Sequence, residues 1–204
     1  MRAQICGASS AVEFVRLRCA NRTFYGPAVV ITRLIREIPL MSLPTTLLQA
    51  SELGIRLEIV NGLPIWEAQP VYRHQKHIER IVQGITKPAD PQPGCGCVHA
   101  VDVYIQFPNG LKRPDISIFC REPSEEEYDS ALTMIPEAVI EVVSKGYEAK
   151  DLEIGPPFYL SQGVKDVVVF DPLTLLVLHV RRDRTTRQIS PVEIELECGC
   201  RLLV

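Results

Sequence analysis

Alternating apolar and polar residues mark two hairpins in the first half of the chain. The segment IRLEIVNGLPIWE (55–67) has an Asn-Gly pair between two alternating runs, which is typical of a type I′ turn. The segment VDVYIQFPNGLKRPDISIFC (101–120) repeats this pattern around Pro-Asn-Gly, and Asp115 stands at or near the start of its second strand. We therefore expect two antiparallel strand pairs.

Helical spacing of apolar residues predicts one amphipathic helix, and continuous apolar runs predict two buried strands. Residues 72–85, YRHQKHIERIVQGI, place isoleucine and valine at helical spacing, and the Pro- and Gly-rich residues 86–97 follow as a loop. Residues 137–144 and 166–171 are apolar on both faces, as central strands of a covered sheet are. Residues 145–163 have partial helical spacing, and their Gly-Pro-Pro sequence must end one helical piece and can begin another.

A last hairpin pattern, in residues 173–196, completes an α+β or mixed α/β domain with few helices beside its sheet. The chain has 204 residues, which suits one domain with its own core. We assign residues 41–204 to this domain. Residues 1–40 lack a sustained period and are expected to form a loosely packed N-terminal extension, and the alternative is that they add a strand or helix to the main sheet.

Composition places the chain among globular proteins, because 46% of its residues are apolar and 23% are charged. Its net charge of −3 is not that of a basic protein, so any contact with nucleic acid has to come from a local patch. The seven cysteines are an odd number, and the N-terminus lacks the layout of a secretory signal. We therefore expect a cytoplasmic protein, and no apolar run is long enough to predict a membrane span.

Two carboxylates in the predicted strands are the strongest candidates for chemistry. Asp115 follows a proline, and Glu141 lies in the middle of a strand that should neighbour it. Side chains on one face of adjacent strands can lie about 5 Å apart, close enough to share one Mg²⁺ or Mn²⁺ ion. Such an ion would also compensate for the burial of Glu141. The alternative is that Asp115 caps a turn and Glu141 pairs with an arginine or lysine.

Several short blocks resemble one nuclease family. KRPDISIF, IPEAVIEVVS and KDLEIGPPFYLSQGVKDVVVFDP are similar, in order and spacing, to the Uma-two-type restriction endonucleases of the PD-(D/E)XK superfamily. IRLEIVNGLPI and HQKHIERIVQGI resemble that family's first hairpin and first core helix, so the similarity spans about residues 45–180. It implies a restriction endonuclease-like core: a central mixed sheet with flanking helices and terminal hairpins.

By this resemblance, Asp115 and Glu141 are the family's metal ligands. Glu58 matches the hairpin glutamate, with a surface salt bridge as the alternative, and His74 matches the histidine at the helix start, with an exposed or capping residue as the alternative. The superfamily's lysine is absent from its two expected places, which are Val143 and Gly155 here.

A lysine in such a site stabilises the charged transition state or orients the attacking water. Lys150, or else Lys145, is the candidate to reach into the site from the same segment. The resemblance thus implies a catalytic set of Asp115, Glu141, Lys150 and Glu58. The expected activity is Mg²⁺-dependent hydrolysis of DNA phosphodiester bonds, with no organic cofactor.

The alternative is a degenerate member of the fold that binds nucleic acid or a protein partner without cleavage. If the protein does cleave, a symmetric dimer would let two sites cut both strands.

Two further motifs offer other chemistry. The sequences CGCVH (95–99) and CGC (198–200) could supply thiolates and an imidazole for Zn²⁺, although C-x-C is not the usual knuckle spacing and the two pairs would have to meet in space. The arginines of HVRRDRTTRQ (179–188) suit phosphate contacts, or they belong to a solvated turn.

Overall fold

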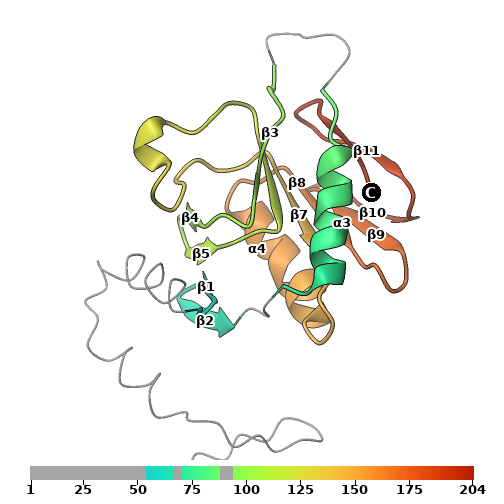
Figure 1. The fold of residues 1–204 in the computed structure, drawn as a ribbon, viewed down its shortest axis with the longest axis horizontal. Coiled ribbons are helices and arrows are strands. Elements are labelled where there is room, and N and C mark those ends of the chain that lie inside the picture. The colour runs from blue at the N-terminus through green and yellow to red at the C-terminus, as the bar shows by residue number, and fades with distance from the viewer. Residues whose placement is uncertain (1–53, 67–69, 88–93) are drawn as a thin grey trace, which may run out of the picture. The chain divides into compact units, whose positions relative to one another are not determined.

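The computed structural model of the chain describes residues 54–66, 70–87 and 94–204. The extension predicted for residues 1–40 and its boundary at residue 41 lie outside the described residues. The elements in chain order (Figure 1) are β1 (Leu57–Val60), β2 (Leu63–Trp66), α3 (Tyr72–Gln83), β3 (Val98–Val101), β4 (Ile105–Phe107), β5 (Gly110–Lys112), β6 (Ile116–Phe119), the 3₁₀ turn η2 (Glu125–Glu127), β7 (Ala138–Val142), the π-helical turn η3 (Lys150–Ile154), α4 (Gly155–Ser161), β8 (Asp166–Phe170), β9 (Leu176–Val180), β10 (Thr185–Ile189), β11 (Glu193–Glu195) and β12 (Arg201–Leu203).

A six-stranded mixed sheet carries the core, in the order β10-β9-β8-β7-β6-β3. Only the central pair, β7 and β8, is parallel, and every residue of these two strands is buried. The apolar runs at 137–144 and 166–171 therefore form central strands, as their composition predicts. Mixed sheets with two α-helices among the described residues make the fold α+β, in agreement with the sequence.

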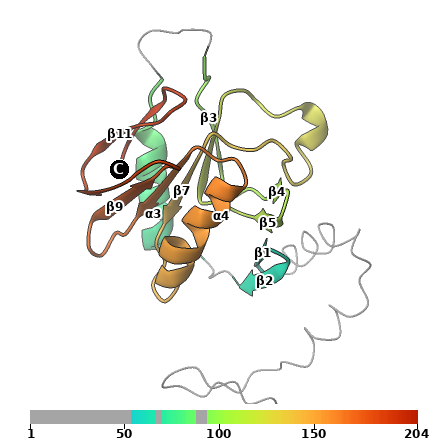
Figure 2. The same cartoon turned by 180° about the vertical axis from the view of Figure 1, so that it is seen from behind.

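The helices α3 and α4 cover opposite faces of this sheet. Along β7, Ile140 packs in one apolar cluster with Ile78 of α3, whereas Val139 packs in another with Phe158 of α4. This split follows from the alternation of side chains across a strand. Figures 1 and 2 view the molecule from opposite sides, and α3 is in front of the sheet in one and α4 in the other.

The hairpin predicted at 101–120 forms, but each of its strands is divided in two. Its base, β3 with β6, belongs to the six-stranded sheet, and its tip, β4 with β5, belongs to a four-stranded sheet in the order β2-β1-β5-β4. The division falls where Asp102 has a positive φ of 58° and where Pro114 lacks an N–H to donate. The alternating pattern did not predict this division, and Asp115, directly before β6, stands where the chain passes from one sheet to the other.

The first hairpin has the predicted turn. Asn61 and Gly62 both have positive φ, 50° and 80°, as a type I′ turn requires. A second glycine allows the two hairpins to meet, because a Cβ atom on Gly110 would lie 2.1 Å from the carbonyl oxygen of Ile59. Only glycine permits this close approach of β5 to β1.

The second half of the chain continues the sequence pattern, with two departures. The Gly-Pro-Pro sequence does not interrupt a helix: the π-helical turn η3 runs directly into α4, and Pro156 sits in the first turn of α4, where its missing N–H is tolerated. The last hairpin forms as β9 and β10, but β11 pairs with β12 as a separate hairpin that was not predicted. Among the described residues, no helix is both long and apolar enough to cross a bilayer.

Candidate active site

Asp115, directly before β6, and Glu141, on β7, lie next to each other. The antiparallel register of β6 and β7 sets Ile116 opposite Ile140. Asp115 directly precedes Ile116 and Glu141 directly follows Ile140, so the two acidic residues are neighbours, and both line the same cavity. The backbone N–H of Val142 donates to Asp115 Oδ2 at 2.7 Å, and that of Asp115 donates to Glu141 Oε2 at 3.3 Å. The structure thus brings together the two acidic residues that the sequence singled out.

The environment of the Glu141 carboxyl disfavours its ionised form. Its side chain is buried, and the Tyr159 hydroxyl donates a 2.5 Å hydrogen bond to its Oε1 atom. Burial, followed by the charge of Asp115, raises the pKa of Glu141 well above its usual value, although Lys112 and Lys150 act in the opposite direction. A cation placed between the two carboxylates would offset both the burial and the charge of Asp115.

Glu58 anchors two lysines behind the carboxylate pair. Its Oε2 atom lies 2.8 Å from Lys112 Nζ and 3.0 Å from Lys150 Nζ, and its Oε1 atom accepts the backbone N–H of Arg113 at 3.0 Å. Burial opposes ionisation of Glu58, but the two lysines lower its pKa overall. Glu58 has no exposed surface. The alternative of a surface salt bridge was therefore wrong, because this ion pair is internal.

His74, from α3, contacts the Asp115 carboxylate. It sits in the first turn of α3, where its Nε2–H donates to Asp115 Oδ1 at 2.9 Å and its Nδ1 lies 3.3 Å from Ser144 Oγ. Burial lowers the pKa of His74, but the hydrogen bond to Asp115 and its charge raise it overall. His74 is neither exposed nor a helix cap, so its alternative assignment was wrong.

A small polar cavity lies between these groups. Its volume is about 30 Å³, more than the roughly 10–15 Å³ that one water molecule needs. This is room for an ion with one water molecule. The charged and histidine side chains that line it are Arg56, His74, Asp102, Asp115, Glu141, Lys150 and Asp151.

Asp151 is a third acidic residue at the cavity that sequence reasoning did not assign to the site. Its Oδ2 atom accepts the backbone N–H of Ser144 at 3.2 Å, and its Oδ1 atom lies 4.0 Å from Lys150 Nζ. Burial raises its pKa to about 6 against the effect of Lys150. Its position directly after Lys150 in the KDLEI block is the only signal in the sequence that points to it.

Two arginines and Asp102 form the outer part of the site and were also missed. Arg56 Nη2 lies 2.7 Å from Asp102 Oδ2, and Arg113 Nη2 lies 2.8 Å from the same atom. Burial lowers the pKa of Arg113, but its hydrogen bond to Asp102 raises it overall. No periodicity of the sequence joins these three residues, because Arg56 precedes β1 and the other two come from opposite arms of the second hairpin.

The other two candidate motifs lie in separate parts of the fold. The two C-x-C pairs do meet, since a disulfide joins Cys97 to Cys200 and a second joins Cys95 to Cys120. The arginine-rich turn connects β9 to β10, where Arg181 binds the buried Asp166. Neither motif belongs to the lining of the carboxylate cavity.

Comparison with known proteins places the chain in a family. A family model described as "Putative restriction endonuclease" (Uma2) matches residues 44–198, which is most of the chain and includes the whole carboxylate cavity. The chain belongs to this family. Asp115 and Glu141 both lie within the matched residues.

One solved structure supports the fold. It is described as the crystal structure of "a putative nuclease belonging to DUF820" from Anabaena variabilis, and it is 19% identical to the chain with a TM-score of 0.52. The match covers 69% of this chain and 81% of that chain. The chain thus has the restriction endonuclease-like fold expected from its sequence. No curated protein matches the chain.

Proposed function

We propose that the protein is an endonuclease that hydrolyses DNA phosphodiester bonds with the help of Mg²⁺ or Mn²⁺ held by Asp115 and Glu141. The observation that carries this proposal is the pair of carboxylates, one directly before β6 and one on β7, at the wall of a polar cavity that Lys150 also lines. Membership of the Uma2 family supports the nuclease assignment.

The donors at the cavity fit a hard divalent cation. Carboxylate oxygens are the ligands that such ions prefer, and one or two of them with several waters are the usual protein contribution. The raised pKa of Glu141 supports this assignment, because one ion would let both carboxylates carry their charge. When bound, the ion would lower the pKa of a water and neutralise charge on the phosphate oxygens.

The neighbouring side chains hold the two carboxylates in place. His74 and the backbone N–H of Val142 each bind one oxygen of Asp115, and Tyr159 binds one oxygen of Glu141. Both carboxylates line the cavity. Such fixed hydrogen bonds reduce the reorganisation that a reaction requires.

Lys150 takes the place of the family lysine that is absent at residues 143 and 155. It lines the cavity from the start of η3, and its ion pair with Glu58 restrains its flexible side chain. In this position the ammonium group would stabilise negative charge on the phosphate during cleavage. Lys112 is fully buried beneath it and stays paired with Glu58, so its role is to support the position of Glu58.

A second candidate function has one observation in its favour. Glu58 lies 3.0 Å from the Lys150 ammonium group and partly neutralises it. If this pair persists when DNA is bound, the protein would retain DNA without cutting it. A cleavage assay separates the two functions.

Incubation of supercoiled plasmid with purified protein, with EDTA, Mg²⁺ or Mn²⁺, tests the proposal. Metal-dependent nicking that disappears in Asp115→Asn and Lys150→Met supports it. The matched controls are Glu153→Gln and Lys145→Met, which change exposed residues of the same segment and should cut at the wild-type rate. Salt-sensitive DNA retention without nicking in any metal would establish the binding module instead.

The assay also reports on assembly. A symmetric dimer would place two sites on one duplex, so linear plasmid would appear together with nicked plasmid. A monomer would produce linear DNA only after the nicked form accumulates. Light scattering at the assay concentration gives the matching molecular mass.

A further inference from the structure

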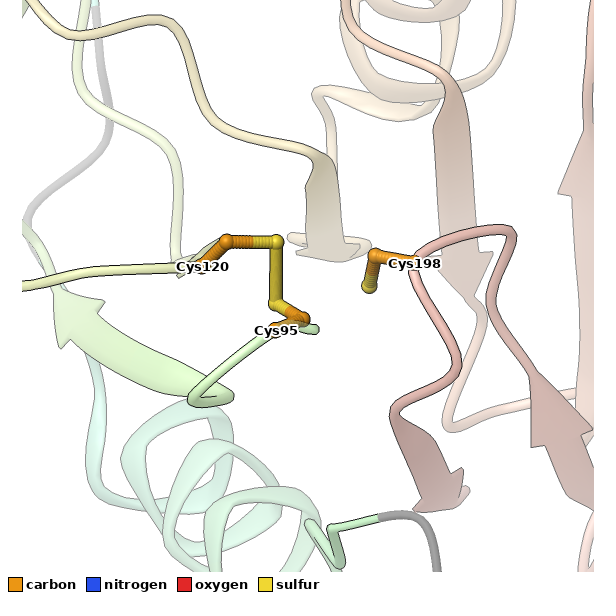
Figure 3. A group of neighbouring side chains, drawn as sticks. All are labelled: Cys95, Cys120 and Cys198. Carbon is orange, nitrogen blue, oxygen red and sulfur yellow. A yellow bond between two sulfur atoms is a disulfide. The ribbon is translucent and has the colours of Figure 1, made fainter. Parts of the chain in front are cut away.

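Five cysteines from three segments converge at one place, away from the carboxylate cavity. Cys95, Cys120 and Cys198 have their sulfur atoms within 4.8 Å of one another, and so do Cys95, Cys97 and Cys200. Cys95 belongs to both groups. Figure 3 shows Cys198 pointing from its loop toward the disulfide between Cys95 and Cys120.

The backbone around these cysteines is built to bring them together. Cys95 and Cys97 precede β3, Cys120 directly follows β6, and Cys198 and Cys200 lie in the β11–β12 turn. The N–H of Gly96 donates to the carbonyl oxygen of Cys120 at 2.7 Å, which holds the first C-x-C beside Cys120.

In the second C-x-C, Gly199 has a φ of 87°, and its N–H donates to the carbonyl oxygen of Leu196 at 2.9 Å. A side chain at this position would be strained. The second C-x-C is therefore a tight turn, and both motifs contribute sulfur atoms to the same cluster.

This arrangement has the donor set of a zinc site. Zn²⁺ binds four thiolates in a tetrahedron with Zn–S distances of about 2.3 Å, which sets neighbouring sulfurs about 3.8 Å apart. Both groups of sulfurs already meet within 4.8 Å, so small side-chain rotations would complete the tetrahedron. The ligands are soft sulfurs, whereas the carboxylate cavity offers hard oxygens.

We propose that the reduced protein binds one Zn²⁺ at this cysteine cluster, through Cys95, Cys120, Cys198 and one cysteine of the Cys97–Cys200 pair. Because Cys95 is common to both groups, an ion beside it takes three ligands from the first group and its fourth from the second. The ion would tie the β11–β12 hairpin to the ends of β3 and β6.

The disulfide and zinc forms differ by four electrons. Four molecules of a low-molecular-weight thiol reduce the two disulfides, which yields four cysteine thiols and two molecules of the oxidised reagent. Zn²⁺ then binds four thiolates, and their protons pass to water. The site thus fills only under reducing conditions and empties when the disulfides form.

Titration of reduced protein with Zn²⁺ and with Co²⁺, under anaerobic conditions and with a competing chelator, tests the inference. About one equivalent of metal per chain is expected, and Co²⁺ should give the near-ultraviolet charge-transfer band of thiolate ligands together with visible bands of tetrahedral geometry. Absence of stoichiometric binding, or a cobalt spectrum without thiolate bands, would overturn it.

Single-cysteine variants locate the bound metal. Cys198→Ser should lose most of the bound zinc, and the oxidised variant keeps both disulfides, which allows its fold to be checked by circular dichroism. Cys19→Ser, which changes a cysteine outside the described residues, is the matched control and should keep about one equivalent. Unchanged zinc binding in Cys198→Ser would contradict the proposal.

Two more measurements complete the test. The variant Asp115→Asn with Glu141→Gln should retain its zinc, so failure of the nuclease proposal leaves this one standing. Of Cys97→Ser and Cys200→Ser, one should weaken the cobalt thiolate band. If neither does, the four-thiolate site is wrong.

Discussion

Two buried carboxylates on neighbouring strands of the same sheet have environments that shift their pKa values in opposite directions. Asp166 on β8 is bound by His179 Nε2 at 2.6 Å, by the Arg181 guanidinium and by the backbone N–H of Glu197 at 2.7 Å. Burial opposes its ionisation, but these hydrogen bonds lower its pKa overall. Glu141 on β7 instead faces Asp115, and its pKa is raised.

The difference shows how a structural carboxylate can be told from a functional one. A buried carboxylate that several donors and a cation surround already has its charge compensated, so it stabilises the fold. A buried carboxylate beside a second carboxylate is stable as an ion only when a cation joins them. Asp166 belongs to the first kind, and we propose that Glu141 belongs to the second.

The largest effect is expected for activity in Glu141→Gln. Loss of one metal ligand should lower the cleavage rate by about 10³-fold or more, because charge stabilisation at the phosphate depends on it. The same change should leave the free energy of unfolding of metal-free protein within about 1 kcal/mol of wild type, because the neutral amide resembles the protonated carboxyl. Single-turnover cleavage and urea unfolding measure the two quantities. A matched loss of stability and activity would show that Glu141 is structural.

Lys150→Met should reduce cleavage by about 10²-fold, with DNA affinity changed less than the rate. The physical reason is that the ammonium group acts on charge that develops during the reaction. Single-turnover rates at saturating protein, with binding measured by fluorescence anisotropy, separate the two effects. If Lys145→Met causes the larger loss, the assignment of the lysine is wrong.

Asp166→Asn should show the reverse behaviour. We expect it to cost about 2–4 kcal/mol in the free energy of unfolding, because it leaves His179 and Arg181 without their buried anion. Cleavage per folded molecule should remain at the wild-type level. The exposed Asp183→Asn is the control and should change stability by less than about 0.5 kcal/mol. If Asp166→Asn and Asp183→Asn have equal free energies of unfolding, Asp166 contributes no more to stability than a surface carboxylate, and its structural role is contradicted.

The pH dependence of stability should also separate the two carboxylates. Because the folded-state pKa of Glu141 is raised, the unfolded chain releases this proton first, near pH 4.5, and metal-free protein loses stability as the pH rises beyond that point. Because the folded-state pKa of Asp166 is lowered, its contribution is complete above pH 3.8 and is lost as the pH falls further.

Urea unfolding in EDTA between pH 4 and 8 tests the first part. Wild type should lose stability relative to Glu141→Gln as the pH rises, and the difference should shrink when Mn²⁺ is added. Parallel curves for the two proteins at all pH values would contradict the raised pKa.

The sequence predicted the main elements because their signals are local. The Asn61–Gly62 turn, the helix beginning at Tyr72 and the apolar runs of β7 and β8 each depend on a few adjacent residues. The division of the second hairpin was missed, because the positive φ of Asp102 accompanies ion pairs with Arg56 of the first hairpin and with Arg113 of the opposite arm.

The sequence also predicted part of the candidate site. The proximity of Asp115 and Glu141 follows from the register of β6 and β7, because the two acidic residues flank the Ile116–Ile140 pair. The buried pairing of Glu58 with Lys112, and the hydrogen bond from Tyr159, join residues that lie far apart along the chain. Such contacts depend on tertiary packing, which no periodicity encodes.

Binding of Mn²⁺ to the purified protein tests the central claim most directly. Calorimetric titration, at a pH where all variants are folded and in the absence of DNA, should give binding of Mn²⁺ to wild type and to Asp166→Asn. Binding should be lost in Asp115→Asn and in Glu141→Gln. Equal affinity in wild type and Glu141→Gln, or no binding to any of them, would contradict the assignment of these carboxylates to a metal site.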